Sequence, residues 1–143
     1  MATAKLIETH KNGAEIYHGD MCKAKALEFL DEITVPKGLL PVDEIEEFGI
    51  NRNSSFMWLK LKKKMDKKFK KIGQTVLYGV EITCFFEKGH MSKVTGVKAK
   101  ELLVPVAIND IRVGDPEPDM IKFTTPMGLA RSHPSSAFEV GDN

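Results

Sequence analysis

Residues 76–86 read Val-Leu-Tyr-Gly-Val-Glu-Ile-Thr-Cys-Phe-Phe, and this stretch decides the fold class. Apolar side chains recur in it at every second position, which is the period of a β-strand with one buried face. These side chains are Val76, Tyr78, Val80, Ile82, Cys84 and Phe86. Gly79 interrupts the strand and indicates a bulge or a sharp bend of the kind that barrels use.

Shorter apolar runs, separated by turn residues, continue this pattern on both sides. They are Ile45–Ile50, Phe56–Leu61, Met91–Val97, Leu102–Ile108, Ile111–Val113 and Met120–Thr125. Pro105 cannot donate to a ladder, so its strand should lie at an edge or carry a bulge. Roughly six to eight strands at about ten-residue spacing predict a mainly β (α+β) fold, a small antiparallel β-barrel.

One strong helix signal precedes the strands. Asp20 is a good N-cap residue, and Pro36 cannot continue a helix, so we expect the helix to run from Asp20 to Ile33. Its apolar stripe is Met21, Ala24, Leu27, Leu30 and Ile33, widened by Cys22, Ala26 and Phe29. An amphipathic helix of this kind should pack on the barrel.

The chain has 143 residues, which is enough for one domain and too short for two ordinary ones. We expect a single domain over residues 1–143, with an N-terminal arm over 1–18, the helix within 19–35 and the barrel over 36–140. Hydrophobic residues make up 42% and charged residues 29%, a composition typical of soluble globular proteins. We expect a monomer.

Cellular location is predicted from the cysteines and the N-terminus. Cys22 and Cys84 are too few for a disulfide scaffold, and we expect both to be small core residues in a reducing compartment. Residues 1–8 lack the apolar core of a signal peptide. A cytoplasmic protein, peripheral to a membrane at most, is expected.

Charge is balanced in total but divided along the chain. Lys and Arg number 21 against 20 Asp and Glu, yet residues 60–71 alone carry eight lysines in twelve positions. Met65, Phe69 and Ile72 are interleaved at helical spacing, so the run could dip into an anionic membrane surface. The lysines expected at that surface are Lys62, Lys63, Lys64, Lys67, Lys68, Lys70 and Lys71.

Two other interpretations of the lysine run stay open. Its lysines could form a solvated strand end that prevents edge aggregation, or they could contact RNA. Arginine is scarce, with Arg52, Arg112 and Arg131 only, which disfavours specific nucleic-acid recognition.

Motifs for catalysis and for cofactors are weak in this sequence. Ser132 is the first candidate for a nucleophile, but no Gly-x-Ser-x-Gly elbow surrounds it, and the adjacent His133 would point to the opposite face of a strand. Neither His-x-x-x-His nor Cys-x-x-Cys occurs, and no glycine-rich phosphate loop is present. We therefore expect no metal and no cofactor, and we leave open whether the protein is an enzyme.

Several motifs together resemble the plant domain-of-unknown-function family 538. The motifs are Gly13–Tyr17, Pro36–Pro41, Phe56–Lys60, Thr95–Leu103 and Phe123–Phe138. The resemblance implies a small β-barrel with a helix, likened to one half of the bactericidal/permeability-increasing lipid-binding module. It implies no firmly assigned activity, although an ester-hydrolysing role has been proposed, and it suggests a plant protein linked to stress responses.

The expected function is to bind a small apolar or amphiphilic molecule such as a lipid. A small barrel can leave room for one such ligand, and we expect the wall to be formed by Trp58, Val80, Ile82, Cys84, Phe86 and Phe123. These residues could equally form a packed core. A carboxylic-ester hydrolase and a protein-interaction module without ligand are the alternatives.

Overall fold

The computed structural model describes residues 3–101 and 103–139. Leu102 of the predicted strand over 102–108, and the outermost residues of the predicted arm and barrel, lie outside this part. In chain order the elements are α1 (Thr3–His10), β1 (Glu15–His18), α2 (Met21–Glu32), the 3-10 helix η1 (Val42–Glu44), β2 (Ile45–Asn51), β3 (Phe56–Leu61), β4 (Met65–Phe69), β5 (Gln74–Glu87), β6 (His90–Glu101), β7 (Val104–Ala107), β8 (Asp110–Val113), β9 (Met120–Thr124), β10 (Ala130–Pro134) and the 3-10 helix η2 (Ser135–Phe138). The prediction of a mainly β protein is confirmed.

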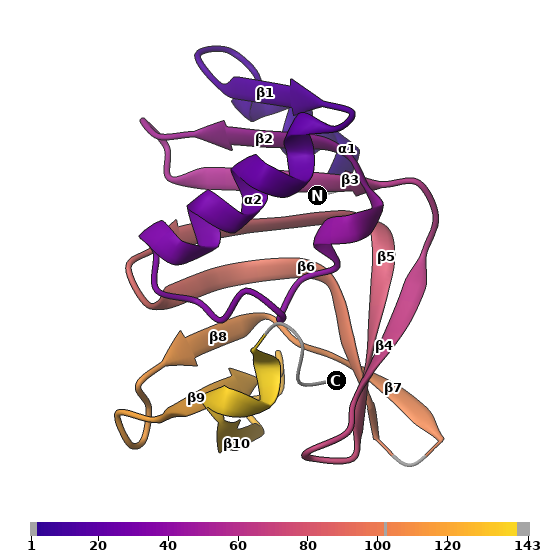
Figure 1. Cartoon of the computed structure of the whole chain (residues 1–143), viewed down its shortest axis with the longest axis vertical. Helices are drawn as coiled ribbons and strands as arrows, with labels where there is room; N and C mark the ends of the chain where they lie inside the picture. Colours follow the sequence, from indigo (N-terminus) through magenta and orange to yellow (C-terminus); the bar gives the residue numbers. More distant parts are fainter. Residues whose placement is uncertain (1–2, 102, 140–143) are drawn as a thin grey trace.

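All ten strands belong to one antiparallel sheet, and the predicted closed barrel is wrong. The strand order is β1-β2-β3-β5-β6-β8-β9-β10, with β4 added to β5 and β7 added to β6. The outer strands β1 and β10 lie at opposite ends of the molecule, so the sheet is curled but open (Figure 1). Both are only four or five residues long, and neither pairs with the other.

The sheet curls because its two longest strands bend together. The pairing of β5 with β6 shifts register between Tyr78 and Thr83, which confirms the bulge or bend expected at Gly79. Opposite this shift, Gly96 has a φ of +80°, and a Cβ on it would lie 2.1 Å from the carbonyl oxygen of Glu81. Only glycine fits there. On one side of the bend, β5 pairs with β3 and β6 pairs with β8. On the other side, β5 pairs with β4 and β6 pairs with β7.

Helix α2 covers the upper half of one face of the sheet (Figure 1). Its buried side chains are Cys22, Ala26, Phe29 and Leu30, whereas Met21 is 55% exposed, so the buried stripe is rotated from the predicted one. The Asp20 side chain makes no capping hydrogen bond, contrary to our expectation. The carbonyls of Leu30 and Asp31 instead accept bonds at the C-terminal end from Val35 and Thr34, and Thr34 has a φ of +63°. This is a Schellman ending with threonine where glycine is usual.

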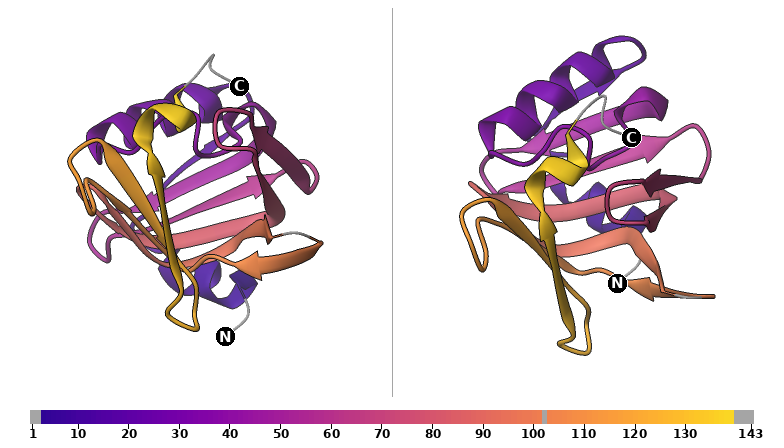
Figure 2. Two further views of the ribbon diagram at one scale, coloured as in Figure 1. Left: turned by 90° about the horizontal axis from the view of Figure 1, so that it is seen from below. Right: turned by 60° about the horizontal axis from the view of Figure 1, so that its bottom comes forward.

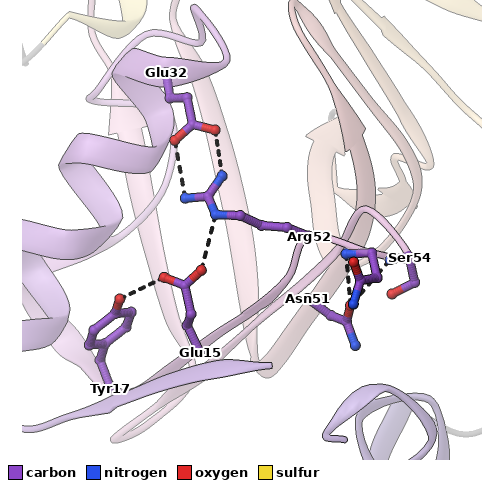
Figure 3. A network of polar contacts seen from close by, with 7 residues as sticks. Glu15, Tyr17, Glu32, Asn51, Arg52 and Ser54 are labelled. Atoms are coloured by element: carbon purple, nitrogen blue, oxygen red, sulfur yellow. Dashed lines mark hydrogen bonds and ion pairs between the residues drawn. The ribbon is translucent and has the colours of Figure 1, made fainter. Parts of the chain in front are cut away.

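An arginine joins α2 to the edge of the sheet. Arg52, in the turn between β2 and β3, donates both Nη1 and Nη2 to Glu32 of α2, at 2.6 and 3.2 Å, and donates Nε to Glu15 of β1 (Figure 3). The Tyr17 hydroxyl donates to the same Glu15, which lowers the pKa of that carboxyl. The fork fixes the C-terminal end of the helix against the β2–β3 turn.

Helix α1, which lies within the predicted N-terminal arm, packs on the other face of the sheet. Its Ile7 is 1% exposed and lies in a small cluster with Phe56 and Trp58. Trp58 Nε1 donates to Glu47 at 2.8 Å. The sheet therefore has two covered faces, with the main core under α2 and this smaller cluster under α1.

The lysine run forms a strand rather than a helix. Strand β4 pairs with β5 through Met65↔Tyr78 and Phe69↔Gln74, so its side chains alternate at period two. Met65, Lys67 and Phe69 face inward, whereas Asp66 and Lys68 are exposed. Pairing with β5 overrides the helical spacing because the ladder satisfies the backbone and buries Phe69.

Candidate ligand-binding pocket

An apolar pocket lies below the bend, where α2 no longer covers the sheet. Its volume is about 380 Å³, within the range of roughly 300–1,000 Å³ usual for small-molecule sites. Its walls come from the lower ends of β5 and β6, from β7 to β10, from the segment after α2 and from η2. The lining residues are Leu39, Leu40, Ile72, Gln74, Val76, Tyr78, Val97, Ala99, Val106, Ile108, Ile111, Phe123, Thr125, Leu129, Ala130, Arg131, His133 and Phe138.

Ring contacts and a buried hydrogen bond join the elements around Phe138 and Tyr78 in the pocket. The Phe138 ring of η2 packs 4.7 Å from Phe69 and 5.3 Å from Phe123, which holds η2 across the curled sheet. The Tyr78 hydroxyl donates to the carbonyl oxygen of Leu39. Complete burial raises the pKa of Tyr78, so the hydroxyl stays protonated and keeps this bond.

Small side chains keep the middle of the pocket empty. Ala99 of β6 pairs with Val76 on one side and with Val106 on the other, so three short side chains stand in a row across the wall. All three line the pocket, as do Phe123 and Leu129. The hollow therefore follows from the bend together with the small residues placed there.

One wall of the pocket carries an arginine and a histidine, and no described carboxylate lines the pocket. In the β9–β10 ladder Arg131 is opposite Phe123 and His133 is opposite Ile121, which places both on the pocket side. The His133 ring lies 6.0 Å from the Phe123 ring and 6.4 Å from the Phe138 ring. The described lining contains no Asp or Glu, so Arg131 and His133 are its only ionisable side chains apart from Tyr78.

A family model for proteins of unknown function, DUF538, matches residues 26–139. The chain belongs to the DUF538 family. The match covers all of the lining residues, which run from Leu39 to Phe138, and it omits α1 and β1. Four of the five motifs quoted for the resemblance lie within it, and Gly13–Tyr17 lies before it. Comparison with curated proteins and with solved structures returns no match.

Of the six wall residues expected from the sequence, this DUF538 protein places only Phe123 in the pocket. Trp58 lies on the opposite face of the sheet, because it pairs with Thr83, whereas Ile82 and Cys84 face α2. Ile82 and Cys84 are fully buried in the packed core beneath α2, and burial raises the pKa of the Cys84 thiol. The prediction that both cysteines are core residues is confirmed.

Because of the bend, the other two expected residues, Val80 and Phe86, lie outside the pocket. Phe86 packs edge-on against Phe29 of α2, with ring centroids 4.9 Å apart. Val80 lies in the register shift and is 50% exposed. Val80 therefore leaves the alternating face of β5, whereas Val76, Tyr78, Ile82 and Cys84 all belong to the main core. Val76 and Tyr78, before the bend, are the alternating residues that do line the pocket.

Most of the pocket was not predicted. Leu39 and Leu40 lie between the predicted helix and the first predicted strand and were not expected in the pocket, although both are buried. β10, which carries Arg131 and His133, was not predicted at all, because its segment is polar.

The lysines expected at a membrane divide into two groups. Lys67 turns inward, where its ammonium donates to the carbonyl oxygen of Gly38 at 2.6 Å, and burial lowers its pKa. The remaining six are exposed, namely Lys62, Lys63, Lys64, Lys68, Lys70 and Lys71.

Ser132 lies outside the pocket. It pairs with Lys122, between Arg131 and His133, and so belongs to the face of β10 that is turned away from the lining. A serine and a histidine do meet elsewhere: His10 Nδ1 and Ser54 Oγ are 2.9 Å apart, with the His10 ring stacked on Phe56. The backbone N–H of Ser54 donates to Asn51 (Figure 3). This pair joins α1 to the β2–β3 turn.

A second hollow, of about 420 Å³, is polar and lies between the β5–β6 and β8–β9 connections. There His90 Nε2 donates to Asp110 at 2.7 Å, and Arg112 Nε lies 3.6 Å from the same carboxylate. The Asp110 carboxylate therefore already has two partners, His90 and Arg112. Within residues 3–101 and 103–139, no three His, Cys, Asp or Glu side chains are grouped closely enough to hold a metal ion.

Proposed function

We propose that the protein binds one small apolar or amphiphilic molecule, such as a lipid, in the pocket beneath the bend, and that it does so at an anionic membrane surface. The observation that carries the proposal is the hollow of about 380 Å³, whose walls are mostly apolar. An unfilled apolar hollow loses contacts that an apolar ligand would restore.

The pocket also supports an amphiphile with a polar or anionic head. Arg131 and His133 stand on one wall, and Gln74 and Thr125 are further polar lining residues. The Gln74 amide already donates to the carbonyl of Lys100, so it would contribute chiefly through its oxygen. A fatty acid fits this distribution, with its chain against Val76 and its carboxylate toward β10.

The membrane part of the proposal rests on the exposed lysines. Six of the seven lysines named above extend into solvent from β4 and from the loops before and after it. Each lysine near an anionic bilayer contributes on the order of 1 kcal/mol, and salt screens the attraction beyond about 8 Å. Within the described residues no helix has the length and apolar character needed to span a membrane.

Titration with an environment-sensitive apolar dye tests the pocket. We expect saturable binding at one site and displacement by a fatty acid. Ala99→Phe, which places a ring among the short side chains of the wall, should weaken dye binding at least about tenfold. Ala107→Phe is the matched control, because Ala107 is exposed on the neighbouring strand and faces away from the pocket.

Val80→Trp is a second control, because Val80 lies in the bend and outside the lining. Equal binding by Ala99→Phe and Ala107→Phe, or no saturable binding by folded protein, would overturn the proposal. The ester-hydrolase alternative requires catalytic turnover of a p-nitrophenyl ester that disappears in Ser132→Ala. If neither activity is found, an interaction module without ligand is left.

A further inference from the structure

Exposed apolar side chains are concentrated on two hairpin tips. Within the described residues, seven large hydrophobic side chains are exposed, and four of them lie on the β6–β7 and β9–β10 connections. Their exposed fractions are 88% for Leu103, 62% for Val104, 87% for Met127 and 71% for Leu129. The other three, Ile16, Met21 and Val80, are each less exposed than any of these and lie on separate elements.

The same two hairpins, together with the β4–β5 hairpin, contribute residues to the pocket. Leu129 of the β9–β10 tip, Val106 of β7 and Ile72 of the β4–β5 turn all line the one hollow. Figure 2 (left) looks at this end of the molecule from below and shows the tips of the three hairpins extending in different directions. We call residues 70–73, 103–105 and 125–129 together the rim.

Charge is distributed unevenly over the rim. Residues 103–109 and 124–130 contain no charged side chain, although 29% of the chain is charged. The β4–β5 tip supplies Lys70 and Lys71, and both are exposed. Residues 70–73, 103–105 and 125–129 therefore combine apolar tips with two lysines, and Glu101 of β6 pairs with Val104 beside them.

We propose that the rim docks on an anionic lipid bilayer, with the two apolar tips inserted among the lipids and the mouth of the pocket facing them. This inference rests on the proposed function and names the surface that would admit the ligand. A bilayer is favoured over a protein partner because the exposed apolar side chains stand in pairs on two separate tips, as in interfacial anchors, and because the lysines match anionic headgroups.

The inference divides the lysine run. Lys62, Lys63 and Lys64 precede β4 and are separated from the rim by its five residues, about 16 Å at roughly 3.3 Å per residue. Only Lys70 and Lys71 belong to the docking face. Replacing the near pair by glutamine should therefore weaken binding to anionic vesicles more than replacing Lys62 and Lys63.

Single-cysteine labelling tests insertion directly. Both native cysteines are buried, so a nitrobenzoxadiazole dye should react selectively with Met127→Cys or Leu103→Cys. On vesicles containing phosphatidylserine we expect the dye at either position to brighten and shift to the blue, and the dye on Val80→Cys to stay unchanged. A change at Val80→Cys equal to that at Met127→Cys would overturn the inference.

The paired variant Leu103→Ser, Met127→Ser should lower partition into the same vesicles at least about tenfold, whereas Met21→Ser, Val80→Ser should leave it unchanged. None of these four residues lines the pocket. Dye binding to the pocket in solution is measured on the same proteins. If the dye binds in the pocket but the tips do not insert into vesicles, only the docking face is refuted. If the parent protein shows no saturable dye binding, the proposed function is refuted. If the tips instead bind a protein in the absence of vesicles, the bilayer proposal is wrong and the partner is a protein.

Discussion

Replacing Gly96 by alanine should destabilise the protein strongly, because this glycine permits the bend that shapes the pocket. Two costs add at the position. An L-residue at a φ of +80° is strained by roughly 1–2 kcal/mol, and a Cβ placed 2.1 Å from the Glu81 carbonyl oxygen forces a backbone shift that costs about 1–3 kcal/mol. Together they predict a loss of about 3 kcal/mol and a fall in Tm of about 10 °C.

Gly79 provides the matched control from the same bend. A Cβ on Gly79 would have its nearest neighbour, Gly96 Cα, at 3.8 Å, which is ordinary contact, and its φ is not positive. Gly79→Ala should therefore change the free energy of unfolding by less than about 1 kcal/mol.

Urea unfolding followed by the fluorescence of Trp58, the single tryptophan, measures both variants. If Gly96→Ala and Gly79→Ala lie within about 1 kcal/mol of each other, the bend does not depend on the conformation of Gly96 and the reasoning fails.

Two further predictions concern the frame around the pocket. Thr34→Gly should raise the free energy of unfolding by about 1 kcal/mol, because glycine adopts the φ of +63° at the end of α2 without strain; a loss on urea unfolding would refute this. Burial opposes ionisation of Glu47, but hydrogen bonds from Trp58 and His18 outweigh it, so the pKa of Glu47 lies below its ordinary value of 4.5. The stabilisation is complete above pH 4.5 and is lost as the pH falls through the lowered pKa, so the pH dependence of unfolding between about pH 5 and 3 should be shallower in Glu47→Gln.

Secondary structure was predictable where the apolar pattern was strong. Helix α2 and the strands β2, β3, β5, β6, β8 and β9 follow from the sequence to within a few residues. Helix α1 was not predicted, because eight residues with one buried side chain, Ile7, give little periodic signal. β4 was misread because Met65 and Phe69 are four apart, a spacing that also fits alternate positions of a strand.

The candidate site was harder to predict than the fold. Alternation along 76–86 assigns one face to the whole strand, but the register shift at the bend puts Val80 in solvent and leaves only Val76 and Tyr78 beside the pocket. A local pattern does not contain this information, because the shift depends on how Gly96 meets Glu81 across the ladder. The prediction of a closed barrel failed for a related reason. Closure depends on whether the two edge strands, which are distant in the sequence, pair with each other.

The place of Trp58 has a practical consequence for ligand searches. Its indole lies under α1, against Gly49, on the side of the sheet opposite the pocket. Trp58 fluorescence would therefore report whether α1 is packed on the sheet. It would change little when a molecule enters the pocket. A screen that relied on quenching of native fluorescence would discard true binders, whereas one that observes the ligand itself, by mass or by extrinsic label, would retain them.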